Sequence, residues 1–410
     1  MWFAVGFGDN ARFVANYDGR MKTVLFAWEC GANFGHLTRD LPLARALAAA
    51  GYRCVFAVKD VAIAAAVLGD EFAFVQCPLP SEPRPAWFPA NHAEFMFATG
   101  YGDAAALLGL VQAWRALFVL TGAALVLADH APSVLLAARS AAIPAIPLGT
   151  GFEVPPAVVP FPFYSRPTPG LSARGAEHAQ RALRSANVVL GKLAQKPLAH
   201  LGELYPPDQI LLLTSPLLDH YGARASACYV GQHAVAPAAQ ADITWSGAPR
   251  LRVFAYLRAY MPQLSELLDA LAQAPDAEII IAIPDMAPAQ AASFSQGSLR
   301  VVPNLVALDA LWHEASVVLS YGGHGLVSRA VETGKPTLIL PGTVEQWLLA
   351  TRVSQQLAHI RVQRQPFAAA SIWPQLQDLA AIPGQIASPA GFVSWSASAA
   401  LRHIERVLAA

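Results

Sequence analysis

Charge is scarce in this sequence. Only 14% of its 410 residues are charged, and 28 basic residues are balanced by 28 acidic ones. Because a neutral chain without a basic run offers no favourable surface to a phosphate backbone, we expect no nucleic acid partner. Hydrophobic residues make up 55% of the chain, yet no run reaches the length typical of a membrane span. Contact with a membrane surface remains open, and the sequence gives no oligomeric state.

Cysteine is also scarce. The 4 cysteines are scattered and form no CxxC pair, which argues against both a disulfide framework and a zinc site. The N-terminus lacks the succession of charged, apolar and small residues that is typical of a signal peptide. We therefore expect a reduced, cytoplasmic protein.

Apolar runs alternate with helical patterns along most of the chain. The run at 104–128 is interrupted by polar residues and a glycine, which predicts a buried helix followed by a strand. Continuous apolar strands between helices predict an α/β protein with parallel sheets covered on both faces. The predicted strands are Thr23–Trp28, Cys54–Val58, Phe72–Val75, Leu125–Ala128, Ile143–Leu148, Asn187–Leu190, Ile210–Leu213, Leu251–Tyr256, Glu278–Ile283, Leu299–Val302, Ser316–Leu319 and Thr337–Leu340.

A change of texture divides the chain. Residues 218–249 are rich in Gly, Ala, Pro, Ser and Gln and lose periodicity, which predicts a linker. We therefore expect two Rossmann-like, doubly wound domains at 21–217 and 250–392, followed by a closing helix at 393–410. Residues 1–20 look unlike the rest and are interpreted as an N-terminal extension. Ligands are expected in the cleft between the domains, at the carboxyl ends of the strands.

A histidine follows the first predicted strand. His36 lies in the loop GANFGHLTRD at the start of a helix, where the helix dipole disfavours an imidazolium. A neutral imidazole there can act as a general base, or it can simply cap the helix. Asp129 follows a later strand, and its carboxylate could orient the imidazole or cap the turn before Pro132. His130 is an alternative base or binding residue.

Two further loops follow strands in the second half. In SYGGHG, the backbone of Gly322, Gly323 and Gly325 at a helix start suits a phosphate, although a tight turn would also favour glycine. The stretch is not a P-loop and fails the G-x-G-x-x-G pattern. In PGTVEQ, Glu345 and Gln346 open a helix and could hold sugar hydroxyls, although an acid in a first turn is common.

Together these loops resemble the GT-B glycosyltransferases, in particular the family of bacterial macrolide and plant natural-product UDP-sugar transferases. The resemblance begins at Met21 and is most specific between Asn304 and Val353. There the family signature has His-Gly-Gly, Gly-Thr, an acid, Gly-x-Pro and an acid-Gln pair. The residues that match are Gly322, Gly323, Gly325, Gly334, Pro336, Glu345 and Gln346, together with Gly35-His36 and Asp129 in the N-terminal half.

The resemblance implies two Rossmann-like domains that face a central cleft. It also implies an inverting, metal-independent transfer of sugar from a nucleotide-sugar co-substrate to a hydroxyl of a small-molecule or lipid-like acceptor, without another cofactor. His36 would be the base and Asp129 its partner. The donor-binding residues would be Arg258, Tyr321, Gly322, Gly323, His324, Gly325, Arg329, Glu345 and Gln346. The acceptor side would be lined by Asn33, Phe34, Trp87, Phe95 and Phe163.

Three residues of the donor loop depart from the family pattern. Tyr321 stands where the family has a histidine and cannot become cationic, and Leu326 replaces a threonine hydroxyl. Arg329 replaces the acid that accepts from the ribose hydroxyls. Two alternatives therefore stay open: a GT-B nucleotide-sugar hydrolase, which GHLTRDLPLARAL also resembles, and a non-catalytic GT-B binding protein.

Overall fold

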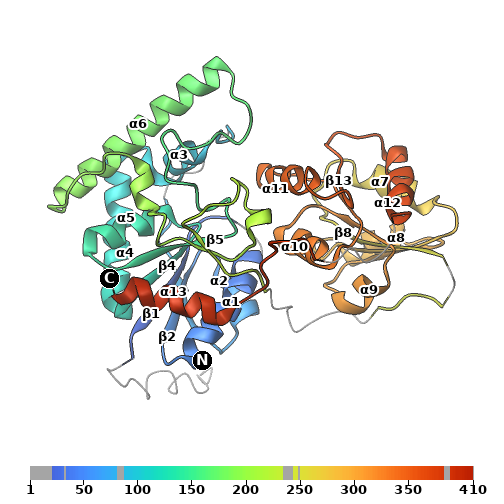
Figure 1. Cartoon of the computed structure of the whole chain (residues 1–410), viewed down its shortest axis with the longest axis horizontal. Coiled ribbons are helices and arrows are strands. Elements are labelled where there is room, and N and C mark those ends of the chain that lie inside the picture. The colour runs from blue at the N-terminus through green and yellow to red at the C-terminus, as the bar shows by residue number, and fades with distance from the viewer. Residues whose placement is uncertain are drawn as a thin grey trace, which may run out of the picture.

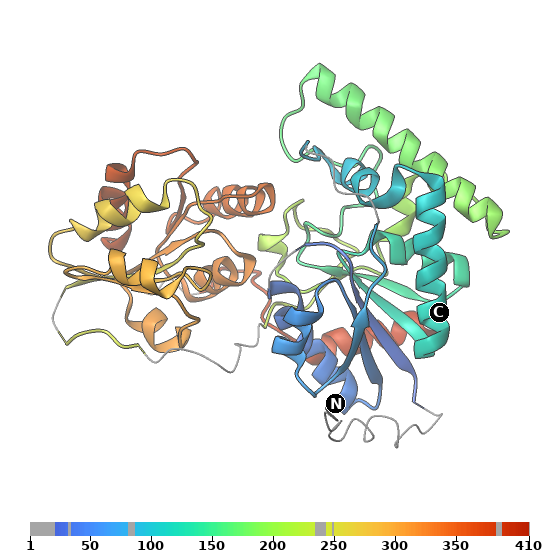
Figure 2. The ribbon, with the colours of Figure 1, turned by 180° about the vertical axis from the view of Figure 1, so that it is seen from behind.

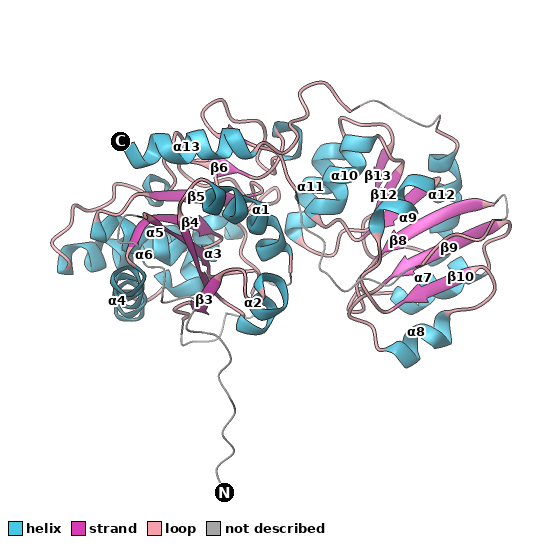
Figure 3. Cartoon of the chain, turned by 90° about the horizontal axis from the view of Figure 1, so that it is seen from below, coloured by secondary structure: helices cyan, strands magenta, loops and turns pink. Residues whose placement is uncertain are grey.

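The computed structural model describes residues 21–31, 34–80, 87–233, 243–247, 250–382 and 388–409 (Figure 1). Its strands form two parallel sheets, which lie towards opposite ends of the long axis (Figure 1, Figure 3). The extension expected at the N-terminus lies outside the described residues.

The first sheet has seven parallel strands in the order β3-β2-β1-β4-β5-β6-β7. Its strands are β1 Thr23–Trp28, β2 Arg53–Val58, β3 Ala73–Gln76, β4 Ala123–Asp129, β5 Ala145–Gly149, β6 Leu211–Leu212 and β7 Cys228–Tyr229. The helices of this half are α1 Gly35–Ala49, α2 Val61–Leu68, α3 His92–Met96, α4 Ala104–Thr121, α5 Pro132–Ala141 and α6 Pro169–Lys192.

Helices cover both faces of this sheet, and successive side chains of a strand point to opposite faces. In β1, Leu25 and Ala27 join the core that also holds side chains of α4, α5 and α6. Val24, Phe26 and Trp28 join the core on the other face, with α1 and α2. An unbroken apolar strand is therefore what the fold requires.

The closing helix returns to the first sheet. α13 (Ala397–Ala409) contacts α1, and its Ala400, Ile404 and Val407 join the core of that face. Figure 2 shows this red helix among the blue N-terminal elements. The chain therefore passes twice between the two sheets.

The second sheet has six parallel strands in the order β10-β9-β8-β11-β12-β13. Its strands are β8 Leu251–Tyr256, β9 Ala277–Ala282, β10 Leu299–Val302, β11 Val317–Ser320, β12 Thr337–Ile339 and β13 Ile360–Val362. Its helices are α7 Leu264–Ala272, α8 Pro288–Phe294, α9 Leu308–Glu314, α10 His324–Thr333, α11 Val344–Ser354 and α12 Ile372–Ala380. In each sheet the strand order reverses beside the first strand, at β1/β4 and at β8/β11, where open α/β sheets bind ligands.

One predicted strand is wrong. Asn187–Leu190 lies inside α6, a helix of 24 residues. Ala186, Val189 and Leu190 are buried whereas Val188 is 46% exposed, which is the pattern of a helix face. The short strands β7 and β13 were not predicted.

The apolar run at 104–128 is a helix followed by a strand, as predicted. Among the described residues, α4 is the one helix that is long and apolar enough to cross a membrane. Its Leu107, Trp114 and Phe118 are buried in the core of the first sheet, while Val119 and Leu120 at its end are exposed. One face of α4 thus packs on the protein.

Candidate functional site

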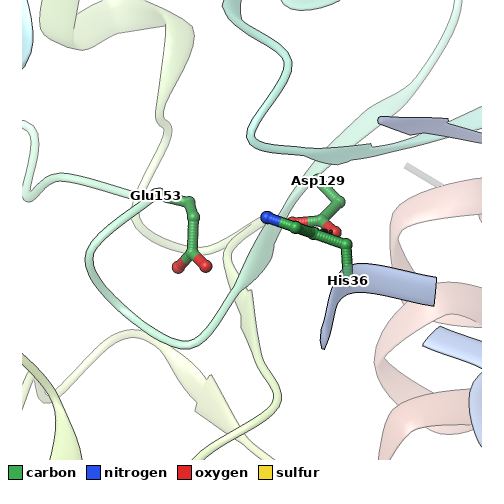
Figure 4. A group of neighbouring side chains, drawn as sticks. All are labelled: His36, Asp129 and Glu153. Atoms are coloured by element: carbon green, nitrogen blue, oxygen red, sulfur yellow. Dashed lines mark hydrogen bonds and ion pairs between the residues drawn. The ribbon is translucent and has the colours of Figure 1, made fainter. Parts of the chain in front are cut away.

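His36 and Asp129 meet at the carboxyl edge of the first sheet. Asp129 is the last residue of β4, and His36 is the second residue of α1, which follows the neighbouring strand β1. The His36 Nδ1 lies 2.7 Å from Asp129 Oδ2 (Figure 4). The carboxylate is 1% exposed and the imidazole 11%, so the pair is enclosed but reachable. The proximity expected from the sequence is confirmed.

The packing around the imidazole fixes its orientation. Trp28 and His130 stack against the ring with centroid distances of 5.3 and 6.0 Å. Gly31 has a φ of +91°, and a Cβ there would come within 2.2 Å of His36 Nε2. Only glycine therefore allows this placement. With Nδ1–H donating to Asp129, Nε2 is left as the proton acceptor.

Three more charged residues complete the site, and the sequence analysis missed all of them. Arg39 Nη2 lies 2.5 Å from Asp129 Oδ1, and its Nη1 lies 3.1 Å from Glu153 Oε1. Asp40 lies 3.7 Å from Arg39 Nε. We call His36, Arg39, Asp40, Asp129 and Glu153 the buried charge cluster. The one signal in the sequence is that Arg39 lies three residues after His36, on the same helix face.

The charges within the cluster compensate one another. Burial raises the pKa of Asp129, but Arg39 and His36 outweigh it, so the net shift is downward. Glu153 behaves alike, with Arg39 as the main opposing charge, and its pKa falls well below the ordinary value. Burial and then Asp129 raise the pKa of Asp40 well above its usual range. Asp129 and Glu153 are therefore favoured in the ionised form beside Arg39, whereas burial and Asp129 disfavour the charge on Asp40.

The same residues have the spacing of metal ligands. His36, Asp129 and Glu153 each offer an atom within 4.8 Å of the others (Figure 4). The guanidinium of Arg39, however, already contacts both carboxylates, so a cation occupies the place that a metal would need. At this group of three residues, Arg39 therefore competes with a metal ion for the two carboxylates.

The glycine loop joins β11 to α10 in the second sheet. Gly322 has a φ of +90°, and its N–H donates to Ser320 Oγ at 3.0 Å. The Tyr321 ring folds back over the loop, so that a Cβ on Gly323 would lie 2.6 Å from its hydroxyl oxygen. Burial raises the pKa of Tyr321, which is therefore a neutral donor. Gly325 lies in the first turn of α10.

His324 does not have the position expected of a phosphate ligand. Its Nε2 lies 2.8 Å from Thr214 Oγ1, just after β6 of the first sheet, and its Nδ1 is hydrogen-bonded to Gln232. Burial, followed by nearby His220, lowers the pKa of His324 to about 3. The ring is therefore neutral with both nitrogens engaged, and it joins the two halves of the molecule.

The two arginines predicted for donor binding are held by surface acids. Arg329 donates to Asp309 at 2.6 Å and lies over Trp312, with centroid distance 5.1 Å. Arg258 Nε lies 3.4 Å from Asp285 Oδ2. Both side chains therefore have carboxylate partners within the second half of the chain.

Glu345, at the start of α11 beside the second sheet, is influenced by charges of the buried charge cluster. It is half-buried in the first turn of α11. Burial raises its pKa to about 7, Glu153 adds to the increase, and His36 and Arg39 oppose it. The charges of Glu153, His36 and Arg39 on the first sheet therefore act on the carboxyl of Glu345.

Gln346 has a structural role that the sequence analysis missed. Its Oε1 accepts from the backbone N–H groups of Gly342 at 2.8 Å and Thr343 at 3.1 Å, which forms a capping box at the start of α11. The carbonyl oxygen is thus used within the protein, and only the amide N–H groups are left for a ligand.

The residues predicted for the acceptor side divide into two groups. Phe95 stacks on His130 at 4.6 Å, one ring away from His36. Phe34, 40% exposed, caps α1 beside His36. Trp87 stacks on His178 at 5.0 Å, and Phe163 packs against Gly175. Because His178 and Gly175 both belong to α6, Trp87 and Phe163 lie against that helix. Asn33 lies outside the described residues.

Comparison with solved structures identifies the fold. Over 95% of both chains, this chain is similar to the glycotransferase of kitacinnamycin, with a TM-score of 0.65 and 19% identity. It is also similar to CalG4, the calicheamicin glycosyltransferase, with a TM-score of 0.64, 18% identity and 95% and 94% of the two chains covered. It is similar as well to the glycosyltransferase VinC in complex with dTDP, with a TM-score of 0.61, 18% identity and 95% and 96% of the two chains covered. No protein-family model and no curated protein matches the chain. At these identities the likeness establishes the GT-B fold.

Proposed function

We propose that this chain is an inverting, metal-independent glycosyltransferase that moves a sugar from a nucleotide-sugar to a hydroxyl of a small-molecule or lipid-like acceptor. The observation that carries the proposal is the His36–Asp129 hydrogen bond at the carboxyl edge of the first sheet. Glycosyltransferases of the same fold include VinC in complex with dTDP and SpnG complexed with spinosyn aglycone.

The proposed reaction is a single displacement. Nε2 of His36 takes the proton of the acceptor hydroxyl while the hydroxyl oxygen forms a bond to the anomeric carbon. The bond from that carbon to the diphosphate oxygen breaks on the opposite face, so the configuration is inverted and a nucleoside diphosphate leaves. Asp129 stabilises the imidazolium that forms.

The second sheet supplies the donor side of the proposal. The backbone of Gly322 and Gly323 and the N-terminus of α10 suit the leaving diphosphate, since their N–H groups and the helix dipole favour negative charge. The half-buried Glu345 has the charge and position to accept hydrogen bonds from sugar hydroxyls. Arg39 supports metal independence, since it fills the cation position between Asp129 and Glu153.

A panel of dTDP-, UDP- and GDP-sugars tests the proposal by thermal shift, followed by product analysis with and without aglycone acceptors. We expect stabilisation by at least one donor class and an acceptor-dependent product of inverted configuration. Release of free sugar at the same rate without an acceptor would instead identify a hydrolase. Failure of every donor to bind would leave the non-catalytic binding protein.

A further inference from the structure

Arg39 is a buried cation that contacts both members of the proposed catalytic pair, His36 and Asp129. Its side chain is 6% exposed. One guanidinium nitrogen, Nη2, lies 2.5 Å from Asp129 Oδ1 and 3.3 Å from His36 Nδ1. The other, Nη1, donates to Glu153 Oε1 at 3.1 Å. Burying an arginine this completely costs free energy unless nearby carboxylates compensate its charge and accept hydrogen bonds from its N–H groups.

We propose that Arg39 is a positioning residue for His36 and that Glu153 holds Arg39 in place, an inference that rests on the proposed function. Asp129 divides its two oxygens between these neighbours: Oδ2 receives His36 and Oδ1 receives Arg39. A guanidinium is planar and keeps its charge, so it prevents the carboxylate from rotating or taking up a proton. Oδ2 therefore stays directed at Nδ1 of the imidazole.

Glu153 decides which way the Arg39 fork points. If Arg39 turned towards His36, it would donate to Nδ1 and force the proton onto Nε2, because an arginine has donors only. That tautomer has no free nitrogen for the acceptor hydroxyl. Glu153 prevents this by drawing Nη1 to itself, while the backbone N–H and hydroxyl of Thr150 fix its other oxygen at 2.9 and 3.0 Å. The distances of 2.7 Å from Nδ1 to Asp129 and 3.3 Å to Arg39 agree with this arrangement.

The variants Arg39→Met, Arg39→Lys and Glu153→Gln test the proposal in the full chain. The matched control is Arg45→Met, on the same helix, where Arg45 forms a surface pair with Glu71 at 2.7 Å. The first measurement is the ¹⁵N spectrum of the His36 side chain, assigned with His36→Gln, which reads the tautomer without any substrate. The second is kcat and donor KM with a donor–acceptor pair that the wild type uses.

In the wild type and in Arg45→Met we expect the Nδ1–H tautomer. In Arg39→Met and Glu153→Gln the Nε2–H form should become populated. We expect kcat of Arg39→Met to fall about 100-fold with donor KM within about 3-fold, as befits loss of a correctly oriented base. Arg39→Lys should recover about a tenth of wild-type kcat, since it keeps the charge but not the fork.

Two results separate the outcomes. If Arg39→Met and Glu153→Gln leave the His36 spectrum unchanged, the positioning role is overturned, whatever the activity. If no donor supports turnover but the tautomer shifts as expected, the positioning role stands and the proposed transfer reaction fails. Should Arg39→Met not fold, the spectrum of Glu153→Gln decides alone.

Discussion

At the residue scale, the proposed base depends on a carboxylate that lies 93 positions away in the chain. Asp129→Asn keeps the size of the side chain but removes the charge that stabilises an imidazolium. We expect kcat to fall about 10³-fold or more, with donor affinity within about 2-fold of the wild type. Steady-state kinetics and donor titration measure both. Asp378→Asn, in an exposed pair with Arg361, is the control, and equal activity of the two variants would remove Asp129 from the mechanism.

Glu345 predicts a pH dependence of donor binding. Its pKa is raised to about 7, mainly by burial, so the side chain is protonated below that value in the folded protein. A protonated carboxyl has less capacity to accept from sugar hydroxyls. Donor KM should therefore rise as the pH falls from about 8 to about 6, and Glu345→Gln should remove this dependence.

The same pKa shift has a consequence for stability. Between the ordinary value of 4.5 and about 7, the folded chain binds the Glu345 proton more tightly than the unfolded chain. The contribution of this group to stability is therefore present at low pH and is lost as the pH rises through about 7. Glu345→Gln should flatten that part of the curve of Tm against pH. The exposed Glu266 on α7 provides the control Glu266→Gln, which should change neither curve.

The residues of the site differ in how far they could be predicted. His36 and Asp129 were found because each follows a buried strand, and parallel strands gather such residues at one edge. Arg39 lies in the same stretch GANFGHLTRD as His36. Its partner Glu153, however, is 114 positions away and follows β5 in a loop that carries no recognisable sequence motif. His324 could not be assigned, because its contacts with Thr214 and Gln232 exist only once the two halves meet.

At the scale of elements, the turn from β11 into α10 predicts two unequal glycine substitutions. Gly322 has a φ of +90°, and a Cβ would lie 3.0 Å from Ile339 and 3.3 Å from Gln346. Gly323 has an ordinary φ of −60°, and an added Cβ meets mainly the hydroxyl end of Tyr321. Gly322→Ala should therefore destabilise the protein more than Gly323→Ala. We expect backbone strain to lower its free energy of unfolding by about 1 kcal/mol more, which a lower Tm would show.

Thermal unfolding together with donor titration checks this order. Gly323→Ala should mainly weaken donor binding, because Tyr321 must shift within the loop that would hold the diphosphate. Gly391→Ala is a control for positive φ in open space, since Gly391 has a φ of +81° with nothing within 4 Å of the added atom. A larger loss of Tm in Gly323→Ala than in Gly322→Ala would contradict the prediction.

Prediction of the elements failed at one instructive place. The segment Asn187–Leu190 was predicted as a strand because periodicity cannot separate a short buried strand from part of a helix. The length of the surrounding pattern decides, and α6 continues without a break from Pro169. The prediction also missed β13 and β7, and β7 lies within the predicted linker at 218–249. The other strands were predicted correctly, since both faces of each sheet are buried and every central strand must be apolar.

At the scale of the whole molecule, the two sheets are joined by more than the linker. α13 returns the chain to the first sheet, and His324 at the start of α10 bonds to Thr214 beside β6. The strand that carries the glycine loop and the sheet that carries His36 are thus connected by a direct contact. The two Rossmann-like domains were predicted from the sequence, but this contact could not be predicted, since it lies between the domains.

The contact predicts how acid acts on the protein. The pKa of His324 is lowered from 6.5 to about 3 by burial and by His220, so the unfolded chain takes up a proton at His324 before the folded chain does. Stability from this group is therefore present above about pH 6.5 and is lost as the pH falls towards 3. His324→Gln, which does not titrate and can still bond to Thr214, should show a shallower fall of Tm between about pH 6.5 and 4. His313→Gln, at an exposed position of α9, should retain the wild-type slope. Equal slopes in His324→Gln and the wild type would mean that protonation of His324 does not contribute to the loss of stability in acid.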